Sequence, residues 1–475
     1  MVQTYNLYIN GEWVKTDDQL EVLNKYTQEV YAQVSKAGEK EVEQATTAAE
    51  TAFKENPLPP YERYKILKRV SELLQENKEE LAKNITMEAG KPLKQTRTEI
   101  DRATQTIELS AEEAKRIHGE GVPVEAAPGS ENRMAYTMKV PVGVVGAISP
   151  FNFPLNLVAH KIAPAIAAGN TVVLKPASNT PTTALKLAEL FEQAGLPRGF
   201  FNVVVGSGST VGQQMMEDER INLYTFTGSA DVGLKLKQNT GLNKLILELG
   251  NNSPVIVDKE ADLDKAASNI AQKSFAFAGQ VCISVQRLYV HEDIQNEFQD
   301  KLFQAIDQLN IGDPNDPDTD VGPMISEEEA ERAEQWIKEA ENNGAKIVYG
   351  GKREGALLHP TVVANVRNEM KVVCEEIFAP VISIIPFADI KACINEVNKS
   401  QYGLQGGIFT KNLETAFYAS KHVHVGGLMI NDSSQYRVDL MPYGGVKGSG
   451  WGKEGPKYAI EDMTEERLIV FNLDQ

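Results

Sequence analysis

The sequence predicts an α/β fold with a doubly wound parallel sheet, a second α/β block and a small β flap. Helical segments such as 185–194 separate short apolar runs of strand length at 143–148, 171–174, 201–205 and 223–226. This alternation is typical of a parallel sheet that helices cover on both faces. The length of 475 residues exceeds what one compact core holds and favours about three domains.

The segments before this sheet have patterns of their own. Residues 8–14 carry an Asn-Gly turn signal between β-prone residues, which predicts a hairpin. From Glu39 to about His118, apolar residues recur at helical spacing. The segment 122–140 returns to strand-like alternation around Pro128-Gly129 and predicts a two-stranded flap. Such a flap is a candidate for contacts between subunits, although edge strands often simply lie on the surface.

The second α/β block spans about 251–430, with strands expected near 287–290 and 381–385. Glycine and proline become dense at 442–455, which we interpret as an ordered loop that lines a site. His422 and His424 alternate as in a strand, but no third ligand stands near them in the sequence, so we expect no metal.

Composition limits the class of partner. The formal net charge of −18 argues against nucleic acid and anionic membranes as partners. No apolar run reaches membrane-spanning length, and the N-terminus lacks the basic and apolar parts of a signal peptide. The three cysteines, Cys282, Cys374 and Cys393, are too few for a disulfide framework and favour reduced thiols. We therefore expect a cytoplasmic protein.

Cys282 and Glu248 form the most informative pair of residues. Cys282 follows small, flexible residues rather than lying in an apolar run, and Glu248 is followed closely by glycine. A thiolate can attack a carbonyl carbon, and a carboxylate can then activate water against the resulting thioester. The pair therefore indicates covalent acyl chemistry that ends in hydrolysis.

Three further positions lie at predicted strand ends. Gly228-Ser229 stands where a helix N-terminus could offer N–H groups to a phosphate, although a plain capped helix fits as well. Lys175 could bind a ribose or phosphate, but a single lysine is usually solvated surface. Asn152 lies between two prolines, where its amide could meet a developing oxyanion; asparagine is also common in such turns.

Taken together and in order, these residues resemble the aldehyde dehydrogenase superfamily nearly end to end. The motifs that carry the resemblance are Pro150-Phe151-Asn152-Phe153-Pro154, Lys175-Pro176, Phe226-Thr227-Gly228-Ser229, Glu248-Leu249-Gly250, Gly279-Gln280-Val281-Cys282, Glu375-Glu376-Ile377-Phe378-Ala379-Pro380 and the stretch 442–450. The resemblance implies oxidation of an aldehyde to a carboxylic acid with NAD or NADP, through a thiohemiacetal and a thioester. It also implies a homodimer or homotetramer.

The resemblance implies a role for each matching residue. Cys282 corresponds to the nucleophile, Asn152 and the Cys282 backbone N–H to the oxyanion hole, and Glu248 to the general base. The implied cofactor contacts are Lys175 on the adenosine ribose, Gly228 and Ser229 on the pyrophosphate, and Glu376 on the nicotinamide ribose with Phe378 beside it.

Ser178 departs from the pattern of strictly NAD-dependent members, which often carry glutamate after Lys-Pro-x. Glutamate would accept hydrogen bonds from a 2′-hydroxyl and repel a 2′-phosphate, whereas serine does neither strongly. We hypothesise that NADP is admitted or preferred, with Lys175 near the extra phosphate. Asn251 replaces the usual glycine after Glu-Leu-Gly, and asparagine tolerates positive φ better than most residues.

Arg102 and Arg437 are the candidate substrate contacts. They resemble positions used by members acting on lactaldehyde, succinate semialdehyde and phosphonoacetaldehyde. Two arginines would favour an anionic tail because guanidinium pairs with carboxylates and phosphonates through two hydrogen bonds. A structural salt bridge for each is an equally good interpretation. Arg287, five residues after Cys282, is expected to have a structural role.

The domain organisation expected from these assignments has four parts. They are a dinucleotide-binding domain (1–121 and 141–250), a catalytic domain (251–430), a substrate-mouth and bridging loop (431–455), and oligomerisation segments (122–140 and 456–475). Three alternatives remain open. They are a succinate-semialdehyde-type enzyme preferring NADP, a thioesterase or acyltransferase using the same cysteine and glutamate, and a non-catalytic dinucleotide-binding protein.

Overall fold

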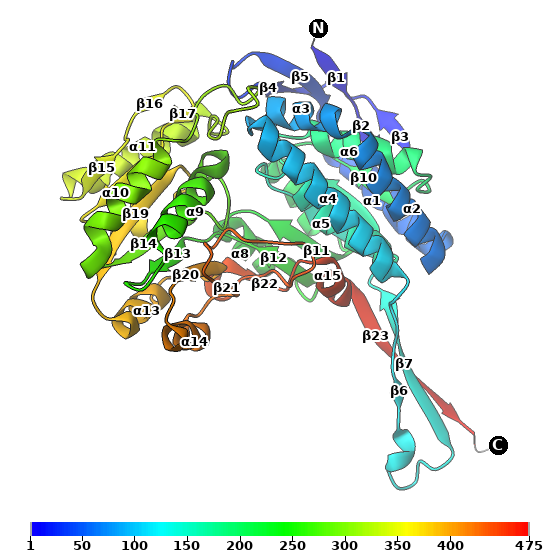
Figure 1. Cartoon of the computed structure of the whole chain (residues 1–475). Coiled ribbons are helices and arrows are strands. Elements are labelled where there is room, and N and C mark those ends of the chain that lie inside the picture. The colour runs from blue at the N-terminus through cyan, green and yellow to red at the C-terminus, as the bar shows by residue number, and fades with distance from the viewer. Residues whose placement is uncertain (1, 474–475) are drawn as a thin grey trace.

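The computed structural model describes residues 2–473 and consists of two sheet-centred lobes and a projecting flap (Figure 1). Residue 1 and residues 474–475 belong to the predicted segments 1–121 and 456–475 and lie outside the described residues. The mixed α/β architecture agrees with the predicted fold class. No helix within residues 2–473 is long and apolar enough to cross a membrane.

An eight-stranded sheet forms the centre of the first lobe. In spatial order its strands are β22 (Gly450–Trp451), β12 (Lys244–Glu248), β11 (Ile221–Thr227), β8 (Val144–Ile148), β9 (Thr171–Lys175), β10 (Phe201–Val203), β2 (Leu7–Ile9) and β3 (Glu12–Val14). The strands from β12 to β10 are parallel, whereas β22 and β2 join the edges antiparallel. Asn10 and Gly11 have φ values of 53° and 70° and form the turn of the predicted hairpin between β2 and β3.

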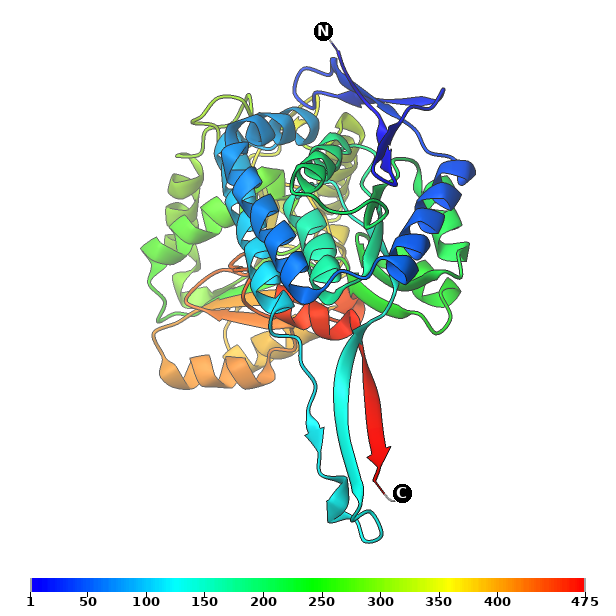
Figure 2. The same cartoon turned by 90° about the vertical axis from the view of Figure 1, so that its right-hand side faces the viewer.

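Helices cover both faces of this sheet (Figure 2). They are α1 (Glu39–Glu55), α2 (Pro60–Glu76), α3 (Lys78–Ala89), α4 (Leu93–Ala114), α5 (Asn156–Ala168), α6 (Thr182–Gln193), α7 (Gln213–Glu217) and α8 (Ala230–Asn239). Every residue of α5 is buried, including His160 and Lys161. A small sheet of β1 (Gln3–Tyr5), β5 (Val30–Ser35) and β4 (Gln19–Leu23) lies beside the lobe.

The second lobe contains a seven-stranded sheet. Its order is β15 (Lys346–Tyr349), β18 (Thr361–Ala364), β19 (Val381–Phe387), β14 (Val285–His291), β13 (Ser253–Val257), β20 (Gln405–Phe409) and β21 (Gly427–Ile430). The surrounding helices are α9 (Leu263–Phe275), α10 (Gln295–Ile306), α11 (Glu327–Asn342), α12 (Lys371–Cys374), α13 (Ile390–Asn398) and α14 (Leu413–His422). The strand expected around His422 and His424 is wrong, because His422 is the last residue of α14.

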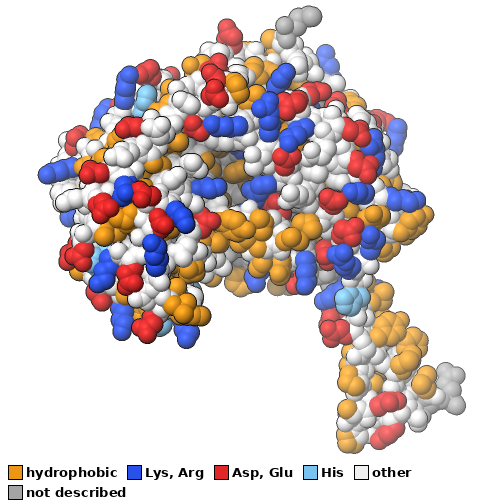
Figure 3. Space-filling view, viewed as in Figure 1, with side chains coloured by type: hydrophobic (Ala, Val, Ile, Leu, Met, Phe, Trp, Pro, Cys, Tyr) orange, Lys and Arg blue, Asp and Glu red, His pale blue; other side chains and the backbone are white. Residues whose placement is uncertain are grey.

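The flap has three strands rather than the expected two. β6 (Gly121–Val122) and β7 (Arg133–Pro141) pair antiparallel, and β23 (Thr464–Asn472), which follows α15 (Pro456–Asp462), adds the third strand. Apolar side chains of β7 and β23 are exposed, namely Met134, Tyr136, Met138, Leu468, Val470 and Phe471. Figure 3 shows orange side chains along the projection.

Candidate active site

The loop before β14 positions Cys282 by an unusual backbone path. Phe277, Ala278 and Gly279 have successive φ values of 48°, 51° and 68°, in the left-handed region, and so reverse the chain after α9. A Cβ at Gly279 would lie 2.1 Å from the carbonyl oxygen of Ala379, so no larger residue fits there. The reversal brings Cys282 to the junction of the two lobes.

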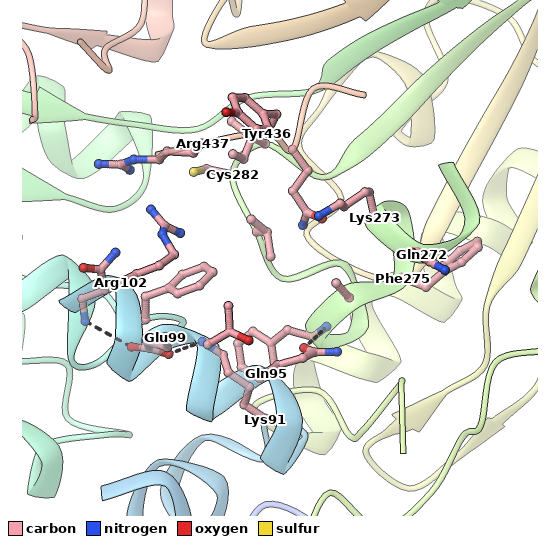
Figure 4. A pocket seen from close by; sticks show the side chains of 18 of the residues that line it. Lys91, Gln95, Glu99, Arg102, Gln272, Lys273, Phe275, Cys282, Tyr436 and Arg437 are labelled. Carbon is pink, nitrogen blue, oxygen red and sulfur yellow. Dashed lines mark hydrogen bonds and ion pairs between the residues drawn. The ribbon is translucent and has the colours of Figure 1, made fainter. Parts of the chain in front are cut away.

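The Cys282 thiol borders two hollows. One is a cavity of about 520 Å³ that Arg102, Tyr436 and Arg437 also line (Figure 4). The other is a smaller hollow lined by Glu376 and Phe378. The sulfur therefore faces the first cavity, and the second hollow is a narrow crevice of about 10 Å³ beside it.

The surroundings of the thiol disfavour its charged form. Burial raises the pKa of Cys282 to about 12, and the negative charges of Glu376 and Glu248 act in the same direction. The Cys282 Sγ atom lies 2.9 Å from the Tyr443 hydroxyl, and this contact lowers the thiol pKa, as does the charge of Arg437.

Asn152 packs against the loop that carries Cys282. Its Nδ2 donates a hydrogen bond of 2.9 Å to the carbonyl oxygen of Gln280, two residues before the cysteine. Its Oδ1 is buried and has no partner among the described residues. The side chain is 3% exposed. The structure thus holds an amide next to the cysteine loop, while its oxyanion role stays a prediction.

Glu248 is the last residue of β12 and is 3% exposed. Neither carboxylate oxygen has a hydrogen-bond partner among the described residues. Burial, and then the charge of Glu454, raise the pKa of Glu248 well above its ordinary value, while Arg437 and Lys161 oppose that shift. A buried carboxylate without hydrogen bonds is available to accept a proton.

A buried ion network lies behind these groups, and sequence reasoning did not find it. Glu454 accepts hydrogen bonds from Lys161 Nζ at 3.2 Å and from Arg437 Nη2 at 3.0 Å. Burial opposes the ionisation of Glu454, but Lys161 and then His160 and Arg437 outweigh burial and lower its pKa to about 2. Lys161 and His160 are adjacent in the otherwise apolar helix α5, and this polar pair was the available signal.

Both predicted substrate arginines line the 520 Å³ cavity and both make ion pairs. Arg102 Nη2 donates to Asp439 Oδ1 at 2.9 Å, and the Arg437 guanidinium lies 3.6 Å from the centre of the Tyr443 ring. Their Nη1 atoms have no hydrogen-bond partner within residues 2–473. Structural pairing therefore leaves donors available, and substrate binding by these residues stays a prediction.

Lys273 of α9 is a cavity residue that the sequence did not single out. The other charged lining residues are neutralised in pairs, Lys91 with Glu99, Arg102 with Asp439, Asp320 with Lys94 and Arg437 with Glu454. Lys273 makes no ion pair with any residue that the structure describes. In Figure 4 its side chain enters the hollow from the side opposite Arg102.

Glu376 and Phe378 line the small hollow at Cys282, while their cofactor roles stay predictions. Glu376 Oε1 accepts a hydrogen bond of 2.9 Å from the Asn251 backbone N–H, and burial raises its pKa to about 7. Phe378 packs edge-on against Phe151 with ring centres 5.9 Å apart. Glu376 also lines a third cavity, of about 600 Å³, together with Ser229. Glu376 therefore lines both the hollow at the sulfur and this larger cavity.

The remaining predicted cofactor residues lie along the carboxyl ends of the first sheet. Lys175 is 7% exposed, its Nζ donates to the Pro176 carbonyl at 3.1 Å, and burial lowers its pKa to about 8. Ser178 Oγ donates to the Gly206 carbonyl at 2.9 Å. Ser229 stands at the N-cap of α8 but makes no side-chain capping bond there.

Arg287 is buried and donates to the backbone carbonyl of Asn252 at 3.0 Å and to the Tyr289 hydroxyl at 3.1 Å. These contacts fit the structural role expected for it.

Comparisons with known proteins agree along the whole chain. The profile described as "Aldehyde dehydrogenase family" matches residues 13–469. The 3-sulfolactaldehyde dehydrogenase of Priestia megaterium is 56% identical over 472 residues, which covers 99% of each chain. The lactaldehyde dehydrogenase of Methanocaldococcus jannaschii is 41% identical over 473 residues, covering 98% of this chain and 100% of the relative.

Solved structures share the fold. Aldehyde dehydrogenase 21 from Physcomitrella patens, in complex with the reaction product succinate, has a TM-score of 0.96 and 42% identity, covering 100% of this chain and 99% of its own. Glyceraldehyde-3-phosphate dehydrogenase from Methanocaldococcus jannaschii, complexed with NADP, has a TM-score of 0.92 and 41% identity, covering 96% of this chain and all of its own.

Proposed function

The chain belongs to the aldehyde dehydrogenase family, and we propose that it oxidises a short aldehyde with an anionic or hydroxylated tail, using NAD or NADP. The observation that carries this proposal is the position of Cys282 between two hollows. The first hollow presents arginine donors suited to a substrate tail, and Glu376 lines both the narrow hollow at the sulfur and the 600 Å³ cavity, which has room for part of a dinucleotide. A buried carboxylate without partners, Glu248, lies close enough to act on the thiol electrostatically.

The chemistry divides between two residues. The Cys282 sulfur bonds to the aldehyde carbon, and the carbonyl oxygen becomes the oxygen of a thiohemiacetal, with Asn152 as its hydrogen-bond donor. As the oxyanion re-forms its carbonyl, the hydrogen on that carbon leaves as a hydride, which a bound nicotinamide would accept, and a thioester on Cys282 remains. Glu248 then takes a proton from water, whose oxygen attacks the thioester carbon. The carbon–sulfur bond breaks, the thiol is restored and the carboxylic acid departs.

The residues present fit a dinucleotide. Lys175 is a buried cation whose only side-chain hydrogen bond within residues 2–473 is to a carbonyl, so it retains donors for a ribose or phosphate. Ser229 makes no capping bond, which leaves backbone N–H groups at the start of α8 for a pyrophosphate. Glu376 would hold the nicotinamide ribose, with Phe378 beside it. The nicotinamide supplies the hydride acceptor that this oxidation needs.

Two observations favour acceptance of NADP. The Ser178 hydroxyl is bonded to Gly206, and Lys175 makes no ion pair with any residue from 2 to 473. A 2′-phosphate would therefore meet the Lys175 ammonium group, which no carboxylate already neutralises. Solved relatives are found with either cofactor. The Methanocaldococcus jannaschii enzyme is complexed with NADP, and the betaine aldehyde dehydrogenase of Staphylococcus aureus, at 32% identity, is in complex with NAD+.

The charges in the 520 Å³ cavity indicate the chemistry of the substrate's tail. The unused Nη1 donors of Arg102 and Arg437 and the unpaired Lys273 give the cavity a net affinity for an anion. A sulfonate or carboxylate on a short hydroxylated aldehyde has this chemistry. The Priestia megaterium relative, named for 3-sulfolactaldehyde, supports the sulfonate, and the lactaldehyde dehydrogenases support the hydroxyl.

An aldehyde panel tests the proposal. We expect NAD(P)H formation with 3-sulfolactaldehyde, lactaldehyde and succinate semialdehyde, measured with each cofactor, and the highest kcat/KM for an anionic tail. Equal kcat/KM for a neutral aldehyde of the same chain length would contradict the anionic tail. A strong NAD preference would contradict the NADP hypothesis. No NAD(P)H from any aldehyde would favour the thioesterase or the non-catalytic alternative instead.

The exposed apolar side chains of the flap support a homodimer or homotetramer. Tyr136 and Phe471 stack on β7 and β23 with ring centres 6.1 Å apart and remain 39% and 44% exposed. A surface of this kind on a projecting sheet suits contact with a second copy of the chain. Analytical ultracentrifugation that finds a monomer would contradict this assembly.

A further inference from the structure

We propose that the Tyr443 hydroxyl is a further catalytic residue, which donates a hydrogen bond to the Cys282 thiolate and stabilises it for attack. The proposal rests on the nucleophilic role given above to Cys282. It goes beyond that role because it assigns the sulfur a partner that neither Glu248 nor Asn152 provides. The carrying observation is the distance of 2.9 Å between Cys282 Sγ and Tyr443 Oη.

The direction of this hydrogen bond changes with the state of the sulfur. In the neutral pair either group could be the donor. Once the thiol has lost its proton, the sulfur can only accept, and the phenol must donate. A hydrogen bond to an anion is stronger than one between neutral groups, so the contact favours the thiolate over the thiol.

Tyr443 keeps the proton that this role requires. Burial, followed by the neighbouring thiol charge, raises the pKa of Tyr443 well above its ordinary value. The phenol therefore stays protonated near neutral pH and acts as a donor rather than a base. Of the groups that favour a charged sulfur, Tyr443 has the largest effect on the thiol pKa, ahead of Arg437.

The hydroxyl is held in place from both sides. Tyr443 is 4% exposed, and its backbone N–H and carbonyl both pair with the backbone of Glu454, at 3.1 and 2.7 Å. Arg437 lies over its ring, and the Glu454 side chain fixes that guanidinium. The donor therefore meets the sulfur without a search through rotamers, as preorganised stabilisation of charge requires.

Alkylation of Cys282 tests the proposal without substrate or cofactor. The full-length enzyme is treated with iodoacetamide at a series of pH values, and modification of Cys282 is followed by peptide mass spectrometry. We expect Tyr443→Phe to slow alkylation about tenfold near neutral pH and to move its rise to higher pH, as loss of one hydrogen bond to a charged group implies. An unchanged pH profile in folded Tyr443→Phe would overturn the proposal.

Two further variants sharpen the result. Tyr436→Phe is the matched control, because Tyr436 lines the same cavity but is 47% exposed and makes no hydrogen bond to the sulfur within residues 2–473. It should keep the wild-type profile, and an equal shift there would overturn the proposal. With 3,5-difluorotyrosine at 443, a more acidic donor of the same shape, the rise should move to lower pH. Because no aldehyde is present, failure here is distinct from failure of the proposed function.

Discussion

Two buried carboxylates in the first lobe have opposite surroundings. Glu88, in α3, is fully buried and accepts four hydrogen bonds, from the backbone N–H and the hydroxyl of both Thr182 and Thr183. Glu248, at the end of β12, is almost as buried and accepts none from the described residues. The first carboxylate joins α3 to the N-terminus of α6, where the helix dipole also favours a negative charge.

The difference in hydrogen bonding suggests that Glu88 serves the stability of the fold and Glu248 serves its chemistry. Folded proteins satisfy nearly all of their buried polar groups, because an unsatisfied group costs free energy. A buried carboxylate without hydrogen bonds, such as Glu248, therefore needs an explanation other than stability, and proton transfer beside a nucleophile supplies one. Two cations of the cavity also differ: Lys91 is buried and paired with Glu99, whereas Lys273 is partly exposed and has no ion pair within residues 2–473.

The largest effect is expected for Glu248→Gln, which tests the functional side of this contrast. Turnover should fall by about 10² to 10⁴-fold, the usual contribution of a general base. The Cys282 thioester should still form, so stopped-flow mixing should show a burst of NAD(P)H followed by almost no steady rate. Cys282→Ser, by comparison, should give no burst. Rapid steady turnover by Glu248→Gln would remove the reason for leaving this carboxylate unsatisfied.

The stability of this variant should depend on pH. Because the folded-state pKa of Glu248 is raised, the folded protein binds the proton more tightly than the unfolded chain does. Wild-type stability therefore falls as pH rises above the ordinary glutamate pKa, and Glu248→Gln should melt at an equal or higher temperature, with a gap that widens with pH. Thermal melts at several pH values measure this gap. A gap that narrows with pH would contradict the proposed burial cost.

A smaller effect, in free energy rather than turnover, is expected for Glu88→Gln. The amide loses the charge and turns a donor toward the threonines, so the free energy of unfolding should fall by about 3 kcal/mol. The kcat of the folded fraction should stay unchanged. Glu80→Gln is the matched control on α3, since that side chain is 66% exposed and should change stability little. Urea titration compares the two, and equal losses would contradict the contrast.

The smallest effect is expected for Lys273→Gln. Loss of one partly exposed charge should raise KM for an anionic aldehyde about three- to tenfold at low salt and leave a neutral aldehyde unaffected. Lys265→Gln is the matched control, because Lys265 is on the same helix with its side chain 82% exposed and does not line the cavity. Steady-state kinetics at two ionic strengths measure the difference. An equal change in KM for both aldehydes would show that Lys273 does not interact with the charged tail of the substrate.

Local patterns were sufficient for most elements and for the order of the motifs. The apolar runs at 143–148 and 223–226 became β8 and β11, because burial on both faces of a parallel sheet requires such runs. Cys282, Glu248 and Asn152 could be named because loop chemistry leaves a short signature. Their roles stay predictions, as do the domain boundaries.

The sequence by itself therefore determined the fold class, the family and the candidate nucleophile and base, since apolar runs and short motifs of neighbouring residues are enough to predict each of them. Only the tertiary structure decided what surrounds them. The third flap strand pairs Thr464–Asn472 with a segment more than 300 residues earlier. The Glu454 network, the ion pairs of both arginines and the contact of Tyr443 with the sulfur likewise join distant elements. Whether a buried charge is satisfied depends on such neighbours, and no local pattern contains them.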